Sequence, residues 1–163
     1  GELGDCVVVS PDVGNVKVAN MYANLLGCDM AIIDKRRQSG SKVSVKNLIG
    51  EVKGRRVLMF DDMISTAGTV AEAAKVVMEE GATGCECACT HAVLVGQAFQ
   101  RLDTPAISRV TVTDTIPGGE RLKPLEAKLT VRSVARLLGE AVHRIHHDQS
   151  VSAMFRDGIG VKR

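Results

Sequence analysis

The sequence is poor in aromatic residues: it has no tryptophan, one tyrosine and three phenylalanines, about 2% of its 163 residues. We therefore expect a core of aliphatic side chains and methionine. The formal charge is only +2 and no aromatic RNA-binding pattern is present, which argues against a nucleic-acid-binding protein. No apolar run is long enough to cross a membrane, and we find no signal peptide, so we expect no membrane association.

The cysteines lack the even number and the spacing of a disulfide framework; they are Cys6, Cys28, Cys85, Cys87 and Cys89. This usage indicates a reducing compartment, and we expect the cytoplasm. The last three alternate with each other and with His91, a pattern for which a zinc site is the alternative interpretation. Neighbours on one face of a strand lie about 7 Å apart, too far for four of them to surround one ion. We therefore favour buried cysteines in a strand.

Short apolar runs alternate with helical patterns along the chain. We expect strands at 6–10, 30–33, 43–49, 56–60, 84–92, 109–113 and 128–130, and helices at 15–26, 69–80, 96–102 and 134–146. The alternation predicts an α/β fold, a doubly wound parallel sheet between two layers of helices, with 43–49 as an antiparallel excursion. Residues 35–42 should form an exposed, mobile loop, and the tail 156–163 should be disordered.

The most informative stretch is Val57–Thr69, V-L-M-F-D-D-M-I-S-T-A-G-T. Its apolar start predicts a buried strand, which runs into Asp61 and Asp62 and then into a small-residue turn before a helix. Ligands of parallel sheets bind at the carboxyl ends of strands, and the first turn of a helix suits phosphate. Carboxylates suit sugar hydroxyls or Mg²⁺. We infer a phosphorylated sugar, although an ordinary helix start capped by Thr66 or Thr69 is the alternative.

Two further turns carry polar groups that could reach the same edge of the sheet. Asp12 follows the first strand and is either a turn-forming residue or a Mg²⁺ ligand. Lys35 and Arg37 follow the second strand and are either a solvated charge run or a cationic lid. Phosphoryl transfer requires positioning and neutralisation of charge, which such a lid would supply.

Several motifs occur in a fixed order along the chain: Ser10–Gly14, Ile32–Arg37, Val52–Thr69, Thr90-His91, Val112–Pro117 and Ser150–Phe155. Together they resemble the C-terminal half of class I ribose-phosphate diphosphokinases, the synthetases of phosphoribosyl pyrophosphate (PRPP), over about residues 5–155. The resemblance implies a phosphoribosyltransferase-like fold for residues 1–155. It also implies that the N-terminal half, which carries most of the ATP site, is absent from this chain.

The resemblance further implies an activity: transfer of the diphosphoryl group of Mg·ATP to the 1-hydroxyl of ribose 5-phosphate, giving PRPP and AMP. Lys35 and Arg37 would be the catalytic residues, with Arg37 also contacting substrate, and Asp12 would hold Mg²⁺. The residues that would bind ribose 5-phosphate are Asp61, Asp62, Ser65, Thr66, Ala67, Gly68 and Thr69. The family forms dimer-based hexamers activated by phosphate and inhibited by ADP.

Three positions depart from the family pattern. Ser65 stands where the family has aspartate, Ala67 where it often has glycine, and Asn15 where it has a second glycine. We expect Ala67 to have a negative φ, because alanine at positive φ costs about 1 kcal/mol. Two alternative functions remain open, a PRPP-binding phosphoribosyltransferase and a non-catalytic, synthetase-like regulatory or assembly subunit.

Overall fold

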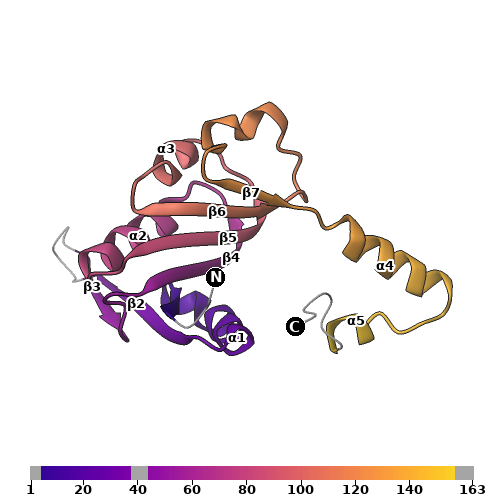
Figure 1. Cartoon of the computed structure of the whole chain (residues 1–163), viewed down its shortest axis with the longest axis horizontal. Coiled ribbons are helices and arrows are strands. Elements are labelled where there is room, and N and C mark those ends of the chain that lie inside the picture. Colours follow the sequence, from indigo (N-terminus) through magenta and orange to yellow (C-terminus); the bar gives the residue numbers. More distant parts are fainter. Residues whose placement is uncertain (1–4, 38–43, 157–163) are drawn as a thin grey trace. The chain divides into compact units, whose positions relative to one another are not determined.

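The computed structural model describes residues 5–37 and 44–156 of the chain, and the side chains of residues 5–34 and 47–155 (Figure 1). It divides into two units, residues 1–131 and 132–163, which are described separately. The larger unit contains almost all of the sheet and its covering helices. Within the described ranges, no helix combines the length and the apolar character needed to span a membrane.

Seven strands form one sheet in the order β3-β2-β1-β4-β5-β6-β7. Their bounds are β1 Cys6–Ser10, β2 Asp29–Arg37, β3 Ser44–Ile49, β4 Arg56–Ile64, β5 Gly84–Ala92, β6 Ile107–Thr113 and β7 Leu129–Arg132. Strand β1 is parallel to both β2 and β4, and β5 is parallel to β4 and β6. Strand β3 pairs antiparallel with β2, which confirms the antiparallel excursion expected from the sequence. The α/β fold with a largely parallel sheet is thus confirmed.

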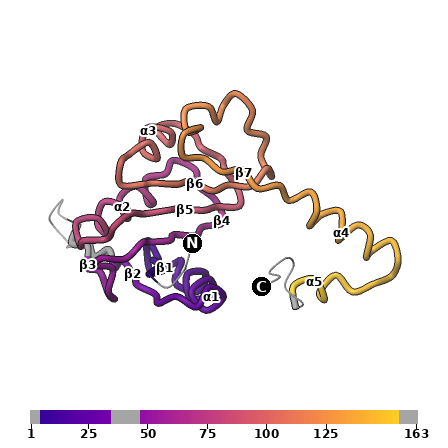
Figure 2. Tube along the Cα trace, viewed as in Figure 1, coloured from indigo at the N-terminus to yellow at the C-terminus, as the bar shows by residue number. Residues whose placement is uncertain are grey.

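The connections between strands carry the helices. Their bounds are η2 Val13–Asn15, α1 Val16–Leu26, α2 Gly68–Glu79, α3 Ala98–Leu102 and η3 Gly119–Leu125, with α4 Ala135–His146 and α5 Ala153–Arg156 in the smaller unit. The Cα trace in Figure 2 follows the chain from β1 through α1 to β2. Gly27 ends α1 at φ 67°, a left-handed conformation that glycine adopts without a steric penalty.

Helices α1 and α2 pack on opposite faces of the sheet. On one face, Ala19 and Ala23 of α1 lie against Val8 of β1. On the other, Ala73 and Val77 of α2 join the larger core, in which the side chains are almost all aliphatic. Every residue of β1 is buried, as expected for an interior strand that is covered on both faces and paired on both edges.

The alternating cysteines of β5 belong to the larger core. Cys85, Cys87 and Cys89 are buried free thiols, as the strand interpretation predicted. Burial raises the pKa of Cys85 to about 12 and that of Cys89 to about 11, and it raises the pKa of Cys87 still further. These thiols are therefore protonated at neutral pH, which suits packing and not metal ligation.

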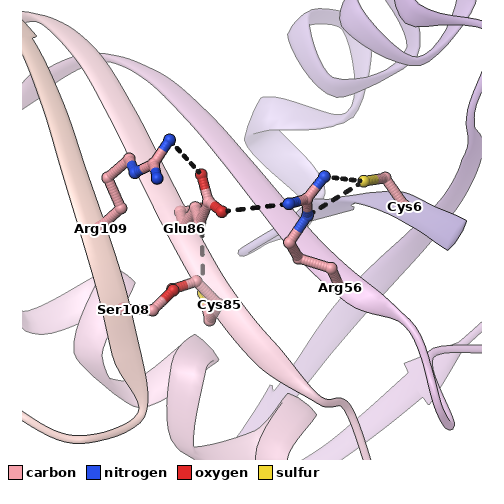
Figure 3. Close-up of polar contacts among 6 residues, drawn as sticks. All are labelled: Cys6, Arg56, Cys85, Glu86, Ser108 and Arg109. Carbon is pink, nitrogen blue, oxygen red and sulfur yellow. Dashed lines mark hydrogen bonds and ion pairs between the residues drawn. The ribbon is translucent and has the colours of Figure 1, made fainter. Parts of the chain in front are cut away.

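Polar side chains link the strands near their amino-terminal ends (Figure 3). Glu86 of β5 lies between two arginines, 3.7 Å from Arg56 and 3.9 Å from Arg109. Arg56 also donates two hydrogen bonds, of 3.3 and 3.1 Å, to the Sγ atom of Cys6, and this contact raises the pKa of Arg56. The network ties β1, β4, β5 and β6 together at the edge opposite to their carboxyl ends.

Two expectations about strand ends were wrong. Strand β4 does not stop at Phe60 but runs to Ile64, because its pairing with β5 continues through Met63 and His91. Strand β2 includes Lys35–Arg37, which pair with β3, so these residues are not part of a loop. The remainder of the predicted loop, residues 38–42, and the tail 157–163 lie outside the described residues, while Arg156 closes α5.

The smaller unit contains α4, whose N-cap position is occupied by Val134 and not by Ser133, the residue that we expected from the sequence to cap this helix. The backbone N–H of Ala135 donates to Oγ of Ser133 at 3.2 Å, which satisfies one amide of the first turn. The helix is amphipathic and leaves an apolar stripe exposed, consisting of Leu138, Val142 and Ile145.

Candidate functional site

The strand order places a topological switch point between β1 and β4. From β1 the chain winds outward to β2 and β3, and it then returns to β4 on the other side of β1. Ligands of open α/β sheets bind beyond the carboxyl ends of the strands at such a point. The turn after β1 and the end of β4 are therefore the first places to look for a site.

Asp12 lies in the turn that follows β1. Its Oδ1 atom accepts hydrogen bonds from the backbone N–H groups of Gly14 and Asn15, at 3.0 and 3.1 Å. The carboxylate thus caps the short helix η2, which fixes its place at the edge of the sheet. The turn-forming interpretation of Asp12 is confirmed, and it does not compete with ligand binding because a carboxylate has several acceptor sites.

Asp61 and Asp62 lie within the carboxyl-terminal part of β4, and not beyond the end of the strand as expected. Asp61 is half-buried and Asp62 is exposed. The backbone N–H of Asp62 donates to Oδ1 of Asp61 at 2.9 Å. Both carboxylates line an open hollow of about 440 Å³ together with Asp12. The structure therefore brings together three acids that are separated by nearly fifty positions in the sequence.

The surroundings of Asp61 change its ionisation. Burial raises the pKa of Asp61 above its ordinary value, and the negative charges of Asp62 and Asp12 raise it further, while the hydrogen bond from the Asp62 amide opposes both. A site of this kind is stabilised by a cation or by hydroxyl donors. Its electrostatics therefore favour the sugar or Mg²⁺ that the sequence suggested.

A second, smaller hollow of about 160 Å³ lies beside the first and shares Asp61 with it. It is lined by Asp61, Met63, Ile64, Ser65, Thr66, Ala67, Gly68, Thr69 and Val70. The carbonyl oxygens of Ile64 and Ser65 accept hydrogen bonds of 3.0 Å from the backbone N–H groups of Leu94 and Val95. In the described part of the chain, the N–H groups of Thr66–Thr69 donate to no acceptor. This loop can therefore offer free amides at a helix N-terminus to an anion.

Ala67 has a φ of 58°, so the expectation of a negative φ was wrong. Its methyl group is buried, at 4% exposure. The residue is the N-cap of α2 and makes no side-chain capping bond. The carbonyls of Ile64 and Ser65 on its amino-terminal side are fixed by Leu94 and Val95, and such surrounding contacts can hold a residue in the left-handed region despite its cost.

The alternative of an ordinary capped helix start is not supported at Thr66 or Thr69. The N-cap position of α2 is occupied by Ala67 and not by either threonine, and no side chain makes a capping hydrogen bond there. The first turn of α2 also carries no acidic residue. Its amides thus lack the side-chain partners that an ordinary cap would provide.

The structure places the backbone of Lys35 and Arg37 at the carboxyl end of β2. Since β1 is parallel to both β2 and β4, this end lies at the same edge as Asp12 and Asp61. The side chains of residues 35–46 are outside the described set, so their role in catalysis stays a prediction.

Mg²⁺ usually takes one or two carboxylates together with substrate phosphates and water, so a complete protein cage is not required. Among the residues that the structure describes, no three His, Cys, Asp or Glu side chains are close enough to hold an ion by themselves. Asp12, Asp61 and Asp62 are hard oxygen donors of the kind that Mg²⁺ prefers. The donor set therefore fits an ion that arrives with a polyphosphate.

Sequence reasoning missed several residues of this edge. Thr90 and Tyr22 line the larger hollow, and the Tyr22 ring stacks on Phe60 with centroids 4.0 Å apart. The Nη1 atom of Arg101 donates to the carbonyl oxygen of Thr66 at 2.9 Å. Of these residues, only Thr90 could have been placed at this edge from the sequence, because the motif Thr90-His91 lies at the end of a predicted strand. The Tyr22–Phe60 and Arg101–Thr66 contacts join segments that are distant in the sequence.

A model of the phosphoribosyl synthetase-associated domain matches residues 38–156 of the chain. The chain belongs to this family. It is 50% identical over 157 residues to a ribose-phosphate pyrophosphokinase from Gloeobacter violaceus, covering 95% of this chain and 46% of the relative. It is 51% identical over 155 residues to one from Rhodopirellula baltica, covering 94% and 48%.

The fold of this family member is confirmed by a solved relative. The phosphoribosylpyrophosphate synthetase of Mycobacterium smegmatis matches with a TM-score of 0.77 and 38% identity, over 89% of this chain and 46% of that one. The phosphoribosyltransferase-like fold predicted from the sequence is therefore correct. The chain spans about half the length of these relatives.

Proposed function

We propose that this chain supplies the ribose 5-phosphate site and the catalytic loop of a ribose-phosphate diphosphokinase. The whole reaction transfers the diphosphoryl group of Mg·ATP to the 1-hydroxyl of ribose 5-phosphate and yields PRPP and AMP. Because this chain spans about half of its relatives, a partner half would bring most of the ATP site.

One observation carries the proposal: an acidic hollow and a loop of free amides lie side by side and share Asp61. Asp61 and Asp62 accept hydrogen bonds from the ribose hydroxyls, and the amides of Thr66–Thr69 bind the 5-phosphate, with Ser65 beside them. Such a division fixes both ends of the sugar and leaves its 1-hydroxyl to the incoming diphosphoryl group.

The remaining functional residues act on the diphosphoryl side of the sugar. Mg²⁺, held in part by Asp12, neutralises polyphosphate charge when it is bound. Lys35 and Arg37 place positive charge near the transferring oxygens, and Arg37 also contacts the sugar phosphate. Five free thiols agree with a reducing compartment such as the cytoplasm. We extend to this chain the homo-oligomeric state and the response to phosphate and ADP that the resemblance implies.

The proposal is tested by calorimetric titration with ribose 5-phosphate, in the presence and absence of Mg·ATP. The isolated chain should bind the sugar phosphate and form little AMP. Adding the N-terminal half of a homologous enzyme should start AMP formation. The double variant Asp61→Asn, Asp62→Asn should lose sugar binding, whereas Glu126→Gln, an exposed carboxylate elsewhere, should retain it.

Two other outcomes separate the alternatives. Sugar-phosphate binding without AMP formation in the reconstituted mixture would identify a non-catalytic synthetase-like subunit. Consumption of PRPP in the presence of a nucleobase would identify a phosphoribosyltransferase. A chain that binds no ribose 5-phosphate at all would contradict the proposal.

A further inference from the structure

Three successive carbonyl groups, at the end of β4 and in the loop that leads into α2, accept hydrogen bonds from residues more distant in the sequence. Those of Ile64 and Ser65 accept from the backbone of Leu94 and Val95, as described above. The third, that of Thr66, accepts at 2.9 Å from a side chain, the guanidinium of Arg101 on α3. This third peptide group is therefore the one whose orientation depends on a single side chain.

The orientation of a carbonyl decides where the next amide points. In a trans peptide the C=O of one residue and the N–H of the following residue point in opposite directions, and the described chain has no cis peptide bonds. Because Arg101 binds the Thr66 carbonyl, the N–H of Ala67 points away from that guanidinium, and Ala67 itself lines the small hollow. This amide is one of the free donors proposed to bind the phosphate.

The same peptide carries the backbone strain of the loop. Ala67 is in the left-handed region at φ 58°, which is unfavourable for alanine by about 1 kcal/mol. Rotation of the Thr66–Ala67 peptide would relieve that strain and would change the direction of the Ala67 amide. The hydrogen bond from Arg101 opposes this rotation.

Arg101 is itself held in place. Its Nη2 atom donates to Oε1 of Gln97 at 3.0 Å, one turn earlier in the same segment. Its Nη1 atom lies 3.5 Å from the position that a Cβ of Gly68 would occupy, so the positive charge stands next to the first residue of α2. A cation there adds to the attraction of the helix N-terminus for an anion.

We propose that Arg101 is a positioning residue for the phosphate group of the sugar: it fixes the Thr66–Ala67 peptide so that the Ala67 amide faces the ligand, and it contributes positive charge nearby. This inference rests on the proposed function of the loop. It adds a residue outside the motif Val57–Thr69, from a helix that follows β5.

The test compares Arg101→Met and Arg101→Lys with the unaltered chain and with Arg109→Met as a control. Arg109 pairs with Glu86 at 3.9 Å near the amino-terminal ends of the strands, at the edge of the sheet opposite to the carboxyl ends. Calorimetry measures the affinities for ribose 5-phosphate and for inorganic phosphate. The affinity for unphosphorylated ribose is measured by NMR, from the chemical shifts of the Asp61 and Asp62 amides during a titration. Thermal melting shows whether each variant is folded.

Arg101→Met should bind both phosphate ligands about tenfold more weakly, which corresponds to about 1.4 kcal/mol, with unchanged affinity for ribose. Arg101→Lys keeps the charge but not the fixed fork, so its affinities should lie between those of the two other forms. Arg109→Met should match the unaltered chain.

Wild-type affinity for ribose 5-phosphate in both Arg101 variants would overturn the inference and leave the proposed function standing. An equal loss of ribose and phosphate binding would also overturn it, because that pattern indicates general damage to the site. Failure of the unaltered chain to bind ribose 5-phosphate would instead refute the proposed function, and the inference with it.

Discussion

The Nδ2 atom of Asn15 donates a hydrogen bond of 2.7 Å to the carbonyl oxygen of Phe60. The backbone N–H of Asn15 also donates a hydrogen bond of 3.1 Å to Oδ1 of Asp12. Its side chain therefore joins the turn after β1 to the residue that precedes Asp61. We expect this bond to help set the distance between Asp12 and the two acids of β4. The family pattern has glycine in place of Asn15 and so lacks this side chain.

Asn15→Ala should lower the free energy of unfolding by about 1 kcal/mol, because the Phe60 carbonyl loses its side-chain donor. It should also weaken Mg²⁺ binding in the presence of a polyphosphate, since Asp12 is no longer fixed relative to Asp61. Urea denaturation and Mg²⁺ titration measure the two effects. Asn20→Ala, on an exposed position of α1, serves as control; equal behaviour of both variants would contradict this role.

The raised pKa of Asp61 makes a prediction about pH. Because burial and neighbouring acids disfavour its ionised form in the folded state, ionised Asp61 lowers stability above its folded pKa. Below the ordinary value of 3.8 the acid is protonated in both states and makes no contribution. Asp61→Asn should therefore stabilise the chain at neutral pH, and this gain should disappear as the pH falls toward 3.8.

The pH prediction is measured by urea denaturation of both forms between about pH 3 and pH 8, without Mg²⁺. Glu126→Gln removes the same charge from an exposed position and controls for the change in net charge. A gain from Asp61→Asn that is constant across this range would show that the charge of Asp61 is not its cause.

Substitutions of Ala67 test the left-handed conformation of the loop. Ala67→Gly removes a penalty of about 1 kcal/mol but loses a buried methyl group and raises the entropy of the unfolded chain, so its net effect should be within about 0.5 kcal/mol. Ala67→Val should destabilise by about 2 kcal/mol or more, because a β-branched residue is strained at positive φ. Thermal or chemical denaturation distinguishes the two. Equal, small effects would argue against the φ of 58°.

Ser65→Asp restores the acid of the family pattern beside the proposed phosphate position. A like charge about 5 Å from the phosphate costs about 1 kcal/mol at high dielectric, so the affinity for inorganic phosphate should fall about fivefold. The loss should shrink as salt is added. Ser65→Asn, which has nearly the same shape without the charge, is the matched control. An unchanged phosphate affinity in Ser65→Asp would place the anion elsewhere.

Local pattern predicted the strands and helices because buried strands and amphipathic helices have distinct periods of apolar residues. It missed the end of β4, since Asp61, Asp62 and Met63 are not an apolar run. They are in the strand because their backbone pairs with β5 as far as Ala92. Strand length was set here by a partner, which no local pattern shows.

The conformation of the loop could not be predicted from its own sequence for a similar reason. Ala67 prefers a negative φ, and its positive φ follows from carbonyls held by Leu94, Val95 and Arg101, thirty or so positions away. The sequence predicted that Asp12, Asp61 and Asp62 lie near the carboxyl ends of strands. The approach of Asp61 and Asp62 to Asp12 required the strand order, in which β1 and β4 are neighbours.

The most direct test of the account follows the backbone amides of the isotopically labelled chain by NMR during titration with ribose 5-phosphate. The amides of Thr66, Ala67, Gly68 and Thr69 should shift in a saturable manner together with those of Asp61 and Asp62. Unphosphorylated ribose should move only the latter pair. Saturable binding that leaves the four loop amides unmoved would contradict the central claim that this loop holds the phosphate.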